Sequence, residues 1–277
     1  MRVTQIYRYP VKSCQGEPVE AATVEPWGLA GDRRWMLADQ AGDLVTAREY
    51  PPLVLVTPRT SGDRIEAAAP GMPRLRTSAE VGRPLVEVRV WDTPVLATPV
   101  PGADAWFSAY LGVPVRLVYL DDPTRRPVDP EYSQPADRVS FADGYPLLLT
   151  TEASLAQLNG WIAAGPLAHE GPLPMNRFRP SVVVTGDAPA FDEDAWRVVR
   201  IGSVVFRSPK GCARCVLTTI DPETAAKGKE PIATQARHRK RDGKEWFGAN
   251  LIPDAPLPSD AIKTGDLVEI LDREDHN

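Results

Sequence analysis

The sequence predicts an α+β protein that is predominantly β. Short runs that alternate apolar and polar residues recur at hairpin-like spacing, as the strands of antiparallel sheets do. The 29 prolines are scattered over the 277 residues without a repeat, which favours many short strands and turns over long helices. Helical periodicity is confined to a few short segments, so helices are expected to be the minor component.

The first 90 or so residues predict a small antiparallel barrel or sandwich. An alternating run over residues 3–9 predicts the first strand, which Pro10 ends. A turn at residues 39–43 is expected to join two strands as a hairpin. The further strands of this part are expected at residues 19–24, 33–38, 44–47, 53–57, 64–67 and 85–90.

The second part of the chain predicts helices among the strands. Residues 104–111 show a short amphipathic pattern, and Thr151 is expected to cap a second helix whose apolar face runs over residues 155–162. Residues 121–138 are polar, proline-rich and aperiodic, and they predict a long surface loop that is a candidate lid. Strands are expected at 115–120, 147–149, 181–184, 196–201, 204–207, 246–251 and 262–270, a weak helix at 225–239, and a frayed tail after Asp272.

Composition excludes several classes of function. The net charge of −5 gives no electrostatic case for nucleic acid, although it is compatible with a local basic site for a small anion. Three cysteines do not make the disulfide framework of a secreted protein. The sequence has no signal-peptide core at its start and no apolar run of about 18 residues, so a cytoplasmic protein without a membrane span is expected.

The chemistry centres on the motif Cys212-Ala213-Arg214-Cys215. Lys210 and Arg214 flank the thiols and should favour the thiolate, which is the form that binds a metal. The β-branched run at 216–220 predicts a strand directly after the motif.

The sequence leaves three other roles for the two thiols to consider. A structural zinc site needs a second pair of soft ligands, which Cys14 and the three scattered histidines do not supply. A thioredoxin-like redox pair should precede a helix, whereas a strand is expected here. A buried pair of small apolar side chains stays open, although the basic neighbours disfavour it for at least one thiol.

Basic residues recur at the edges of predicted strands, as Lys12 beside Ser13, Arg33 beside Arg34, and Arg177 near Arg179. On an extended segment Arg177 and Arg179 would point the same way and form a phosphate clamp. For any single arginine, simple solvation is the plainer interpretation. The glycine-rich phosphate loops and the Gly-x-Ser-x-Gly elbow are absent from the sequence, which disfavours nucleotide binding and serine hydrolysis.

Together the motifs resemble the family of proteins that join a MOSC N-terminal β-barrel domain to a MOSC domain. Within it, the chain is most similar to the amidoxime-reducing components and to bacterial relatives that detoxify N-hydroxylated bases. The segments that carry the resemblance are residues 9–14, 31–35, 45–48, 176–180, 212–221 and 247–250, in this order. The resemblance implies two β-barrel domains, at residues 1–120 and 121–277, with a molybdenum cofactor between them.

The resemblance also implies roles for individual residues. Cys215 would be the catalytic residue and the molybdenum ligand. The molybdopterin and its phosphate would be held by Lys12, Ser13, Arg33, Gly144, Tyr145, Arg177, Arg179, Ala213, Arg214 and Asn250. Each charge-assisted hydrogen bond of this kind contributes about 1.5–3 kcal/mol.

The implied reaction reduces an N–O bond. An N-hydroxylated substrate takes up two electrons and two protons and gives an amine or amidine and water. No cysteine follows Cys215 that could help to hold an iron–sulfur cluster, so a separate flavin or iron–sulfur protein is expected to donate the electrons, and neither nucleic acid nor membrane is expected as a partner. Two alternatives stay open: a carrier of the cofactor or of sulfur, like the C-terminal domain of molybdenum cofactor sulfurase, and a cofactor-free module that binds another anion.

Overall fold

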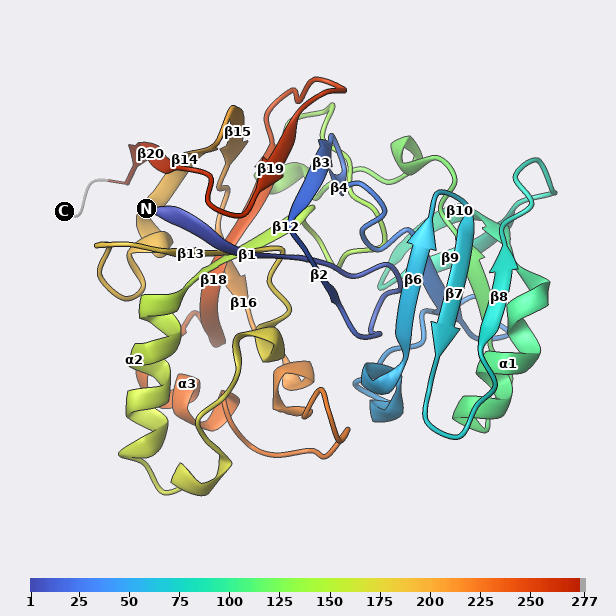
Figure 1. The fold of residues 1–277 in the computed structure, drawn as a ribbon, viewed down its shortest axis with the longest axis horizontal. Coiled ribbons are helices and arrows are strands. Elements are labelled where there is room, and N and C mark those ends of the chain that lie inside the picture. Colours follow the sequence, from blue (N-terminus) through green and yellow to red (C-terminus); the bar gives the residue numbers. More distant parts are fainter. Residues whose placement is uncertain (275–277) are drawn as a thin grey trace.

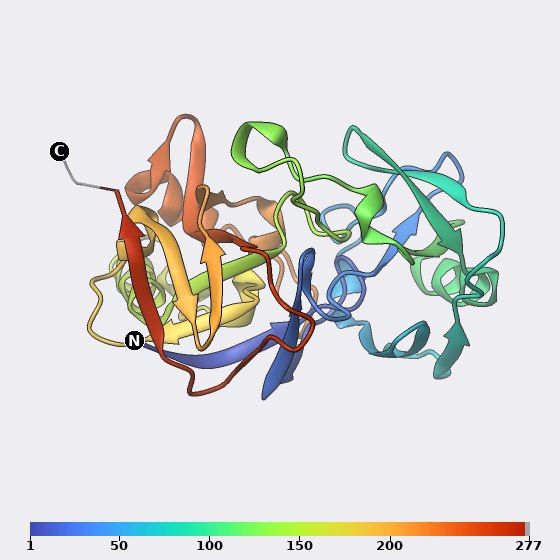
Figure 2. The same cartoon turned by 90° about the horizontal axis from the view of Figure 1, so that it is seen from above.

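The computed structural model describes residues 1–274, which form a large lobe and a small lobe side by side in both views (Figure 1, Figure 2). The large lobe is built on one extended mixed sheet, and the small lobe contains two antiparallel sheets and one helix. Short strands dominate both lobes, which confirms the α+β, mainly β class expected from proline content and alternation.

The sheet of the large lobe has the strand order β2-β1-β13-β12-β18-β15-β14-β20, with β16 and β17 paired to β18. Its strands are β1 (Arg2–Arg8), β2 (Glu17–Val19), β12 (Leu147–Thr151), β13 (Val182–Thr185), β14 (Trp196–Ile201), β15 (Val204–Arg207), β16 (Gly211–Ala213), β17 (Lys240–Arg241), β18 (Lys244–Pro253) and β20 (Val268–Arg273). A second sheet of the order β19-β3-β4 comprises β3 (Ala21–Glu25), β4 (Gly28–Leu29) and β19 (Ala261–Lys263).

Strand β13 is covered on both faces, which explains its unbroken apolar sequence. Val182 and Val184 pack with Ile6 of β1 in the core on one face of the sheet. Val183 packs on the opposite face against a helix. This helix is α2 (Glu152–Ala163), and the shorter α3 (Ile232–His238) lies beside it. The Thr151 hydroxyl accepts a hydrogen bond from the Ser154 amide at the start of α2, as the sequence predicts.

The small lobe packs two antiparallel sheets and α1 (Pro101–Leu111) around a separate core. One sheet has the order β5-β11-β10-β9 and the other the order β6-β7-β8. Trp35, Leu37, Phe107 and Leu117 are fully buried in this core. The strands are β5 (Trp35–Ala38), β6 (Thr57–Ser61), β7 (Arg64–Ala68), β8 (Leu75–Ser78), β9 (Val86–Val90), β10 (Thr93–Pro99) and β11 (Arg116–Tyr119).

The first strands of the chain belong to the large lobe rather than to the small one. Strand β1 pairs antiparallel with β13, with Arg2 opposite Thr185 and Ile6 opposite Val182. Strand β3 pairs with β19 near the other end of the chain. The chain therefore enters the large lobe, builds the small lobe from residue 35 to about residue 120, and returns.

Two segments predicted as strands are 3-10 helices. Residues 53–57 overlap η1 (Pro51–Leu55), because Pro51 and Pro52 fix φ and lack N–H groups, which suits the start of a helix. Residues 216–220 overlap η7 (Val216–Thr219), in which the Thr218 and Thr219 hydroxyls donate to main-chain carbonyls three residues earlier. Such local hydrogen bonds compete with a sheet ladder.

Other expected elements differ in extent. Residues 44–47 make only an isolated bridge between Leu44 and Ala38, and the weak helix predicted at 225–239 is limited to α3. Most of the tail predicted after Asp272 lies outside the described residues. Within residues 1–274, every helix is too short or too polar to cross a bilayer.

Candidate functional site

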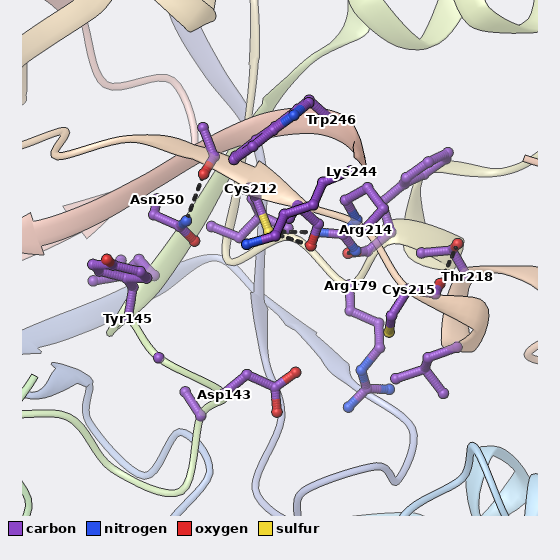
Figure 3. A pocket seen from close by; sticks show the side chains of 18 of the residues that line it. Asp143, Tyr145, Arg179, Cys212, Arg214, Cys215, Thr218, Lys244, Trp246 and Asn250 are labelled. Atoms are coloured by element: carbon purple, nitrogen blue, oxygen red, sulfur yellow. Dashed lines mark hydrogen bonds between the residues drawn. The ribbon is translucent and has the colours of Figure 1, made fainter. Parts of the chain in front are cut away.

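A cavity of about 280 Å³ opens where the two lobes meet (Figure 3). It is lined by the loop after β1, by residues close to β5, by the segment before β12, and by β16, η7 and β18. Ten of the eleven residues implicated by the resemblance line it: Lys12, Ser13, Arg33, Gly144, Tyr145, Arg179, Ala213, Arg214, Cys215 and Asn250.

The cavity lining is strongly cationic. It contains the side chains of seven basic residues against the single carboxylate of Asp143. The basic residues are Lys12, Arg33, Arg48, Arg179, Lys210, Arg214 and Lys244. A concave surface of one sign concentrates ions of the opposite sign, so the cavity is suited to an anion in a protein of net charge −5.

Lys12 is buried on the cavity wall, where it meets the carboxylate of Asp143. Its Nζ lies 2.5 Å from one Asp143 oxygen and donates to the Phe141 carbonyl at 2.8 Å, and Arg48 contacts the other oxygen at 3.1 Å. Burial lowers the pKa of Lys12 to about 8, although Asp143 opposes the shift. Partial desolvation would raise the pKa of Asp143, but Lys12 and Arg48 outweigh it and hold that pKa below its usual range.

Arg33 and Arg179 approach each other from distant parts of the sequence. Arg33 pairs with the buried Asp32 at 2.5 Å, and Arg179 donates to the Cys14 carbonyl at 2.7 Å. Both guanidinium groups pack over the ring of Tyr9, at 4.5 and 4.3 Å from its centroid. Burial lowers the pKa of Arg179.

Three residues of the cavity wall have left-handed backbones without being glycine. Ser13, Arg33 and Arg179 have φ values of 71°, 46° and 56°. Such conformations cost about 1 kcal/mol or more each and cluster at binding and catalytic sites. Their convergence on one cavity marks it as a functional site.

The two cysteines of the motif differ in their surroundings. Arg214 donates to the Cys212 sulfur at 2.9 Å and to the Phe178 carbonyl at 2.6 Å (Figure 3). Cys215 directly precedes η7 and lines the same cavity. Within residues 1–274 no hydrogen-bond donor reaches its sulfur. Cys14 is fully buried, and burial raises the pKa of its thiol to about 12, so it is a core residue.

Asn250 and Tyr145 lie on the side of the cavity away from Arg179 (Figure 3). Asn250 donates from Nδ2 to the Gly211 carbonyl at 2.9 Å, and its amide N–H donates to the Lys210 carbonyl at 3.0 Å. The Lys210 ammonium lies 5.4 Å from the centroid of the Tyr145 ring and 3.6 Å from that of Tyr132. The strand β18 therefore fixes the wall that carries the cysteines.

Arg177 does not join the cavity, and the extended clamp predicted for Arg177 and Arg179 is wrong. Residues 175–178 form the 3-10 helix η5 (Met175–Phe178), and Arg179 follows in the left-handed region, so the segment is not extended. Both side chains line a neighbouring cavity, but only Arg179 also lines this one. Arg177 instead donates to the Thr219 carbonyl and pairs with Asp221 at 3.1 Å. Arg177 therefore stabilises the end of η7 and the residues that follow it.

Sequence reasoning missed several residues of the site. Arg48, Asp143 and Lys244 line the cavity but have no role assigned from the sequence, since a single charged residue is most simply a solvated one. Arg48 ends the segment 45–48 that carries the resemblance, and this is the signal that could have found it. Arg126, in the loop at 121–138, is buried and donates to the carbonyls of Ser140, Ala142 and Asp143, so this loop braces the cavity wall.

Comparison with known proteins places the chain among relatives along most of its length. Residues 1–114 match the family model described as MOSC N-terminal beta barrel domain, and residues 136–269 match the MOSC domain. The mitochondrial amidoxime-reducing component 1 of Homo sapiens is 32% identical over 290 residues, covering 97% of this chain and 82% of the relative. The protein of that name from Danio rerio is 35% identical, with 88% and 76% covered.

A further relative is the molybdenum cofactor sulfurase of Oryza sativa subsp. japonica. It is 29% identical over 90% of this chain, which spans only 32% of the sulfurase.

Proposed function

Because the chain belongs to the family that joins a MOSC N-terminal β-barrel domain to a MOSC domain, as the amidoxime-reducing components do, we propose that it is a molybdenum cofactor-dependent reductase of N-hydroxylated compounds. The names of the relatives support a function related to the molybdenum cofactor. The observation that carries the proposal is the cationic cavity that also contains the accessible thiol of Cys215.

The residues of the cavity fit such a cofactor. The seven basic side chains suit a dianionic phosphate, and a thiolate is a soft ligand suited to a metal that dithiolene sulfurs hold. The buried Nε of Arg214 has no hydrogen-bond partner within residues 1–274, and this leaves a donor for a bound group.

The roles proposed for the residues follow from their positions on the wall. Cys215 would supply the thiolate ligand, and Lys12, Ser13, Arg33 and Arg179 would hold the anionic end of the pterin. The main chain at Gly144-Tyr145 and Ala213-Arg214, with Asn250, would complete the pocket. Arg177 is left out of this set, because its side chain is engaged by Asp221.

A bound molybdenum cofactor would supply the two-electron reduction of the N–O bond, with the amine or amidine and water as products. The protein would position the N-hydroxyl group beside the metal and neutralise the cofactor's charge. A separate flavin or iron–sulfur protein is proposed as the electron donor. A cytoplasmic location stays a prediction, because the names of the animal relatives describe mitochondrial proteins.

The test begins with protein purified from a host that makes the cofactor. We expect molybdenum and pterin fluorescence in the wild type, and sustained reduction of benzamidoxime with an artificial reductant. Cys215→Ser should remain folded, lose at least about 100-fold in turnover and bind molybdenum abnormally, since a thiolate ligand is lost. Cys212→Ser is the matched control and should be milder, because Arg214 already engages that sulfur.

The similarity to molybdenum cofactor sulfurase supports a second candidate, a carrier of the cofactor or of sulfur. A protein that contains molybdenum but shows no turnover of benzamidoxime would favour the carrier. A protein without molybdenum would contradict the reductase and the cofactor carrier, and would leave a sulfur carrier or a cofactor-free anion-binding module.

A further inference from the structure

The ring of Tyr9 packs against two cations, of which only one forms a salt bridge with a carboxylate within residues 1–274. The guanidinium carbons of Arg33 and Arg179 lie 4.5 and 4.3 Å from the ring centroid, and Arg33 donates weakly to the Arg179 carbonyl at 3.4 Å. Asp32 forms a salt bridge with Arg33, and its charge also attracts Arg179, although within residues 1–274 no carboxylate forms a salt bridge with Arg179. One carboxylate offsets only part of the charge of two cations, so a further group is needed to oppose the remaining repulsion.

An aromatic ring can oppose it, because its negative faces attract cations. Tyr9 is only 2% exposed, and its main chain is fixed by hydrogen bonds from the Tyr9 amide to Asp32 at 2.7 Å and from the Arg33 amide to the Tyr9 carbonyl at 2.7 Å. The ring therefore has little freedom, and neither have the guanidinium groups that pack on it.

The hydroxyl of Tyr9 does not explain its presence. It is buried without a hydrogen-bond partner in the described part of the chain, which costs free energy. The ring, by contrast, is accommodated closely. A Cβ at residue 16 would lie 2.3 Å from Cε1 of Tyr9, so glycine at this position leaves the space that the ring fills.

We propose that Tyr9 is a positioning residue, whose ring holds Arg33 and Arg179 together as a preformed clamp for the anionic end of the cofactor. This inference rests on the proposed function for the identity of the anion, but the clamp itself concerns any tetrahedral dianion. Both arginines line the cavity, and both have left-handed backbones. Such strained conformations persist only where surrounding contacts hold them, and the packing on Tyr9 is one of these contacts. The ring lowers the cost of ordering them when the anion binds.

The experiment uses two probes: molybdenum per chain after purification from a cofactor-competent host, and sulfate affinity of the full-length chain from a cofactor-deficient host. Tyr9→Leu should weaken sulfate binding about tenfold and lower molybdenum content, since two cation–π contacts are lost. Tyr9→Phe retains the ring and should match the wild type in both readouts. Gly16→Ala leaves Tyr9 in place but displaces its ring, so it should weaken sulfate binding as Tyr9→Leu does.

Two controls separate positioning from general destabilisation. Phe107→Leu removes a buried ring from the core of the small lobe and should change neither readout. In an Arg179→Gln background, Tyr9→Leu should add less than about twofold to the loss of sulfate affinity, because residues that act through one another are not additive.

The outcomes distinguish the clamp from the proposed function. Wild-type protein without molybdenum, but with sulfate binding that Tyr9→Leu weakens, would overturn the reductase and support the clamp. Molybdenum-loaded wild type with a Tyr9→Leu variant equal to it in both readouts would overturn the clamp alone. A Tyr9→Phe variant as weak as Tyr9→Leu, or a wild type that does not bind sulfate, would overturn it as well.

Discussion

The ammonium group of Lys12 is subject to two opposing effects. Burial lowers its pKa to about 8, while the carboxylate of Asp143 at 2.5 Å partly restores the charged form. In the folded protein without a bound anion, Lys12 therefore loses its charge as the pH rises through about 8, well before a lysine in the unfolded chain does. The charge that the cavity offers to an anion is consequently pH-dependent.

The first prediction concerns this charge. Sulfate affinity of the cofactor-free chain should fall several-fold between pH 7 and about 9.5, because sulfate itself does not titrate there and Lys12 loses its proton near pH 8. Isothermal titration calorimetry across this range measures the effect. Lys12→Gln should bind sulfate more weakly and without this pH dependence. A wild-type affinity that stays constant across the range would contradict the role of Lys12.

Stability should follow the same group with the sign that linkage dictates. Between pH 8 and about 10.5 the unfolded chain holds more protons at Lys12 than the folded chain, so the contribution of Lys12 to stability rises with pH. The penalty for holding a buried ammonium is present below pH 8 and is relieved above it.

At the scale of single residues, the sequence predicted the site where charge and motif coincide. Lys12, Arg33 and Cys215 each stand beside a turn in a motif, and all three line the cavity. Arg177 could not be assigned correctly, since its direction depends on η5 and on the left-handed backbone of Arg179. Periodicity predicts the directions of side chains only in regular elements.

A buried carboxyl group that the proposed chemistry does not use contacts the start of helix α2 from the 3-10 helix η6 (Asp192–Ala195). Glu193 is 1% exposed, accepts from the Ser154 hydroxyl at 2.8 Å and from the Thr151 hydroxyl at 3.3 Å, and has its other oxygen unpartnered within residues 1–274. Burial raises its pKa to about 7, and the neighbouring Asp194 adds to the shift.

The second prediction follows from this raised pKa. Between about pH 4.5 and 7 the folded chain holds more protons at Glu193 than the unfolded chain, so this contribution to stability is lost as the pH rises through 7. Glu193→Gln should remain folded and show a higher melting temperature than the wild type at pH 8, with a smaller difference at pH 5. Differential scanning calorimetry tests this, with Glu152→Gln, a substitution of the exposed first residue of α2, as the control.

The loop at 121–138 is a brace rather than an irregular surface segment. It contains η2 (Pro123–Arg125) and η3 (Pro130–Tyr132), and its buried Arg126 donates to three main-chain carbonyls of the segment before β12. Burial lowers the pKa of Arg126 to about 10. Composition predicted the loop correctly but could not predict which of its arginines points inward.

The third prediction compares two adjacent arginines. Arg126→Met should destabilise the protein by about 2–4 kcal/mol, because it leaves buried carbonyls without donors, and should increase amide exchange over residues 140–145. Arg125→Met removes only a partly exposed pair with Asp121 and should cost less than about 1 kcal/mol. Equal effects of the two substitutions would show that Arg126 does not brace the wall.

Elements with regular periodicity were predicted well, and the 3-10 segments were not. The alternating hairpin β14–β15 and the capped helix α2 lie where their patterns place them. The run at 216–220 is β-branched and yet forms η7, because threonine hydroxyls bond to the preceding turn. These local hydrogen bonds override the strand propensity of the β-branched residues, and amino-acid composition alone does not reveal them.

At the scale of the whole molecule, the sheet of the large lobe is assembled from both ends of the chain. Strand β1 pairs with β13, and β3 pairs with β19, so a cut near residue 120 separates partners. The division into residues 1–120 and 121–277 stays a proposal about sequence units. Alternation reveals which residues face a core, but it does not reveal which distant strand will pair with which.

The fourth prediction uses this arrangement. Residues 121–277 expressed alone should aggregate or stay unfolded, because β13 loses one of its two partner strands and Val182 and Val184 lose part of their cover. Co-expression with residues 1–120 should restore a soluble, folded complex. Far-UV circular dichroism and size-exclusion chromatography measure both outcomes, and a cooperatively folded 121–277 fragment would contradict the prediction.

The pairing of β1 with β13 also determines when this part of the sheet can form during translation. At about 5–20 residues per second, a ribosome needs roughly 10 to 40 seconds after finishing β1 before it has made the strand that pairs with it. During that interval β1 has only β2 beside it, and the edge that will pair with β13 is one that a chaperone can shield. Lys12 and Ser13 likewise meet Cys215 only late in translation, so loading of the cavity has to follow release of most of the chain from the exit tunnel.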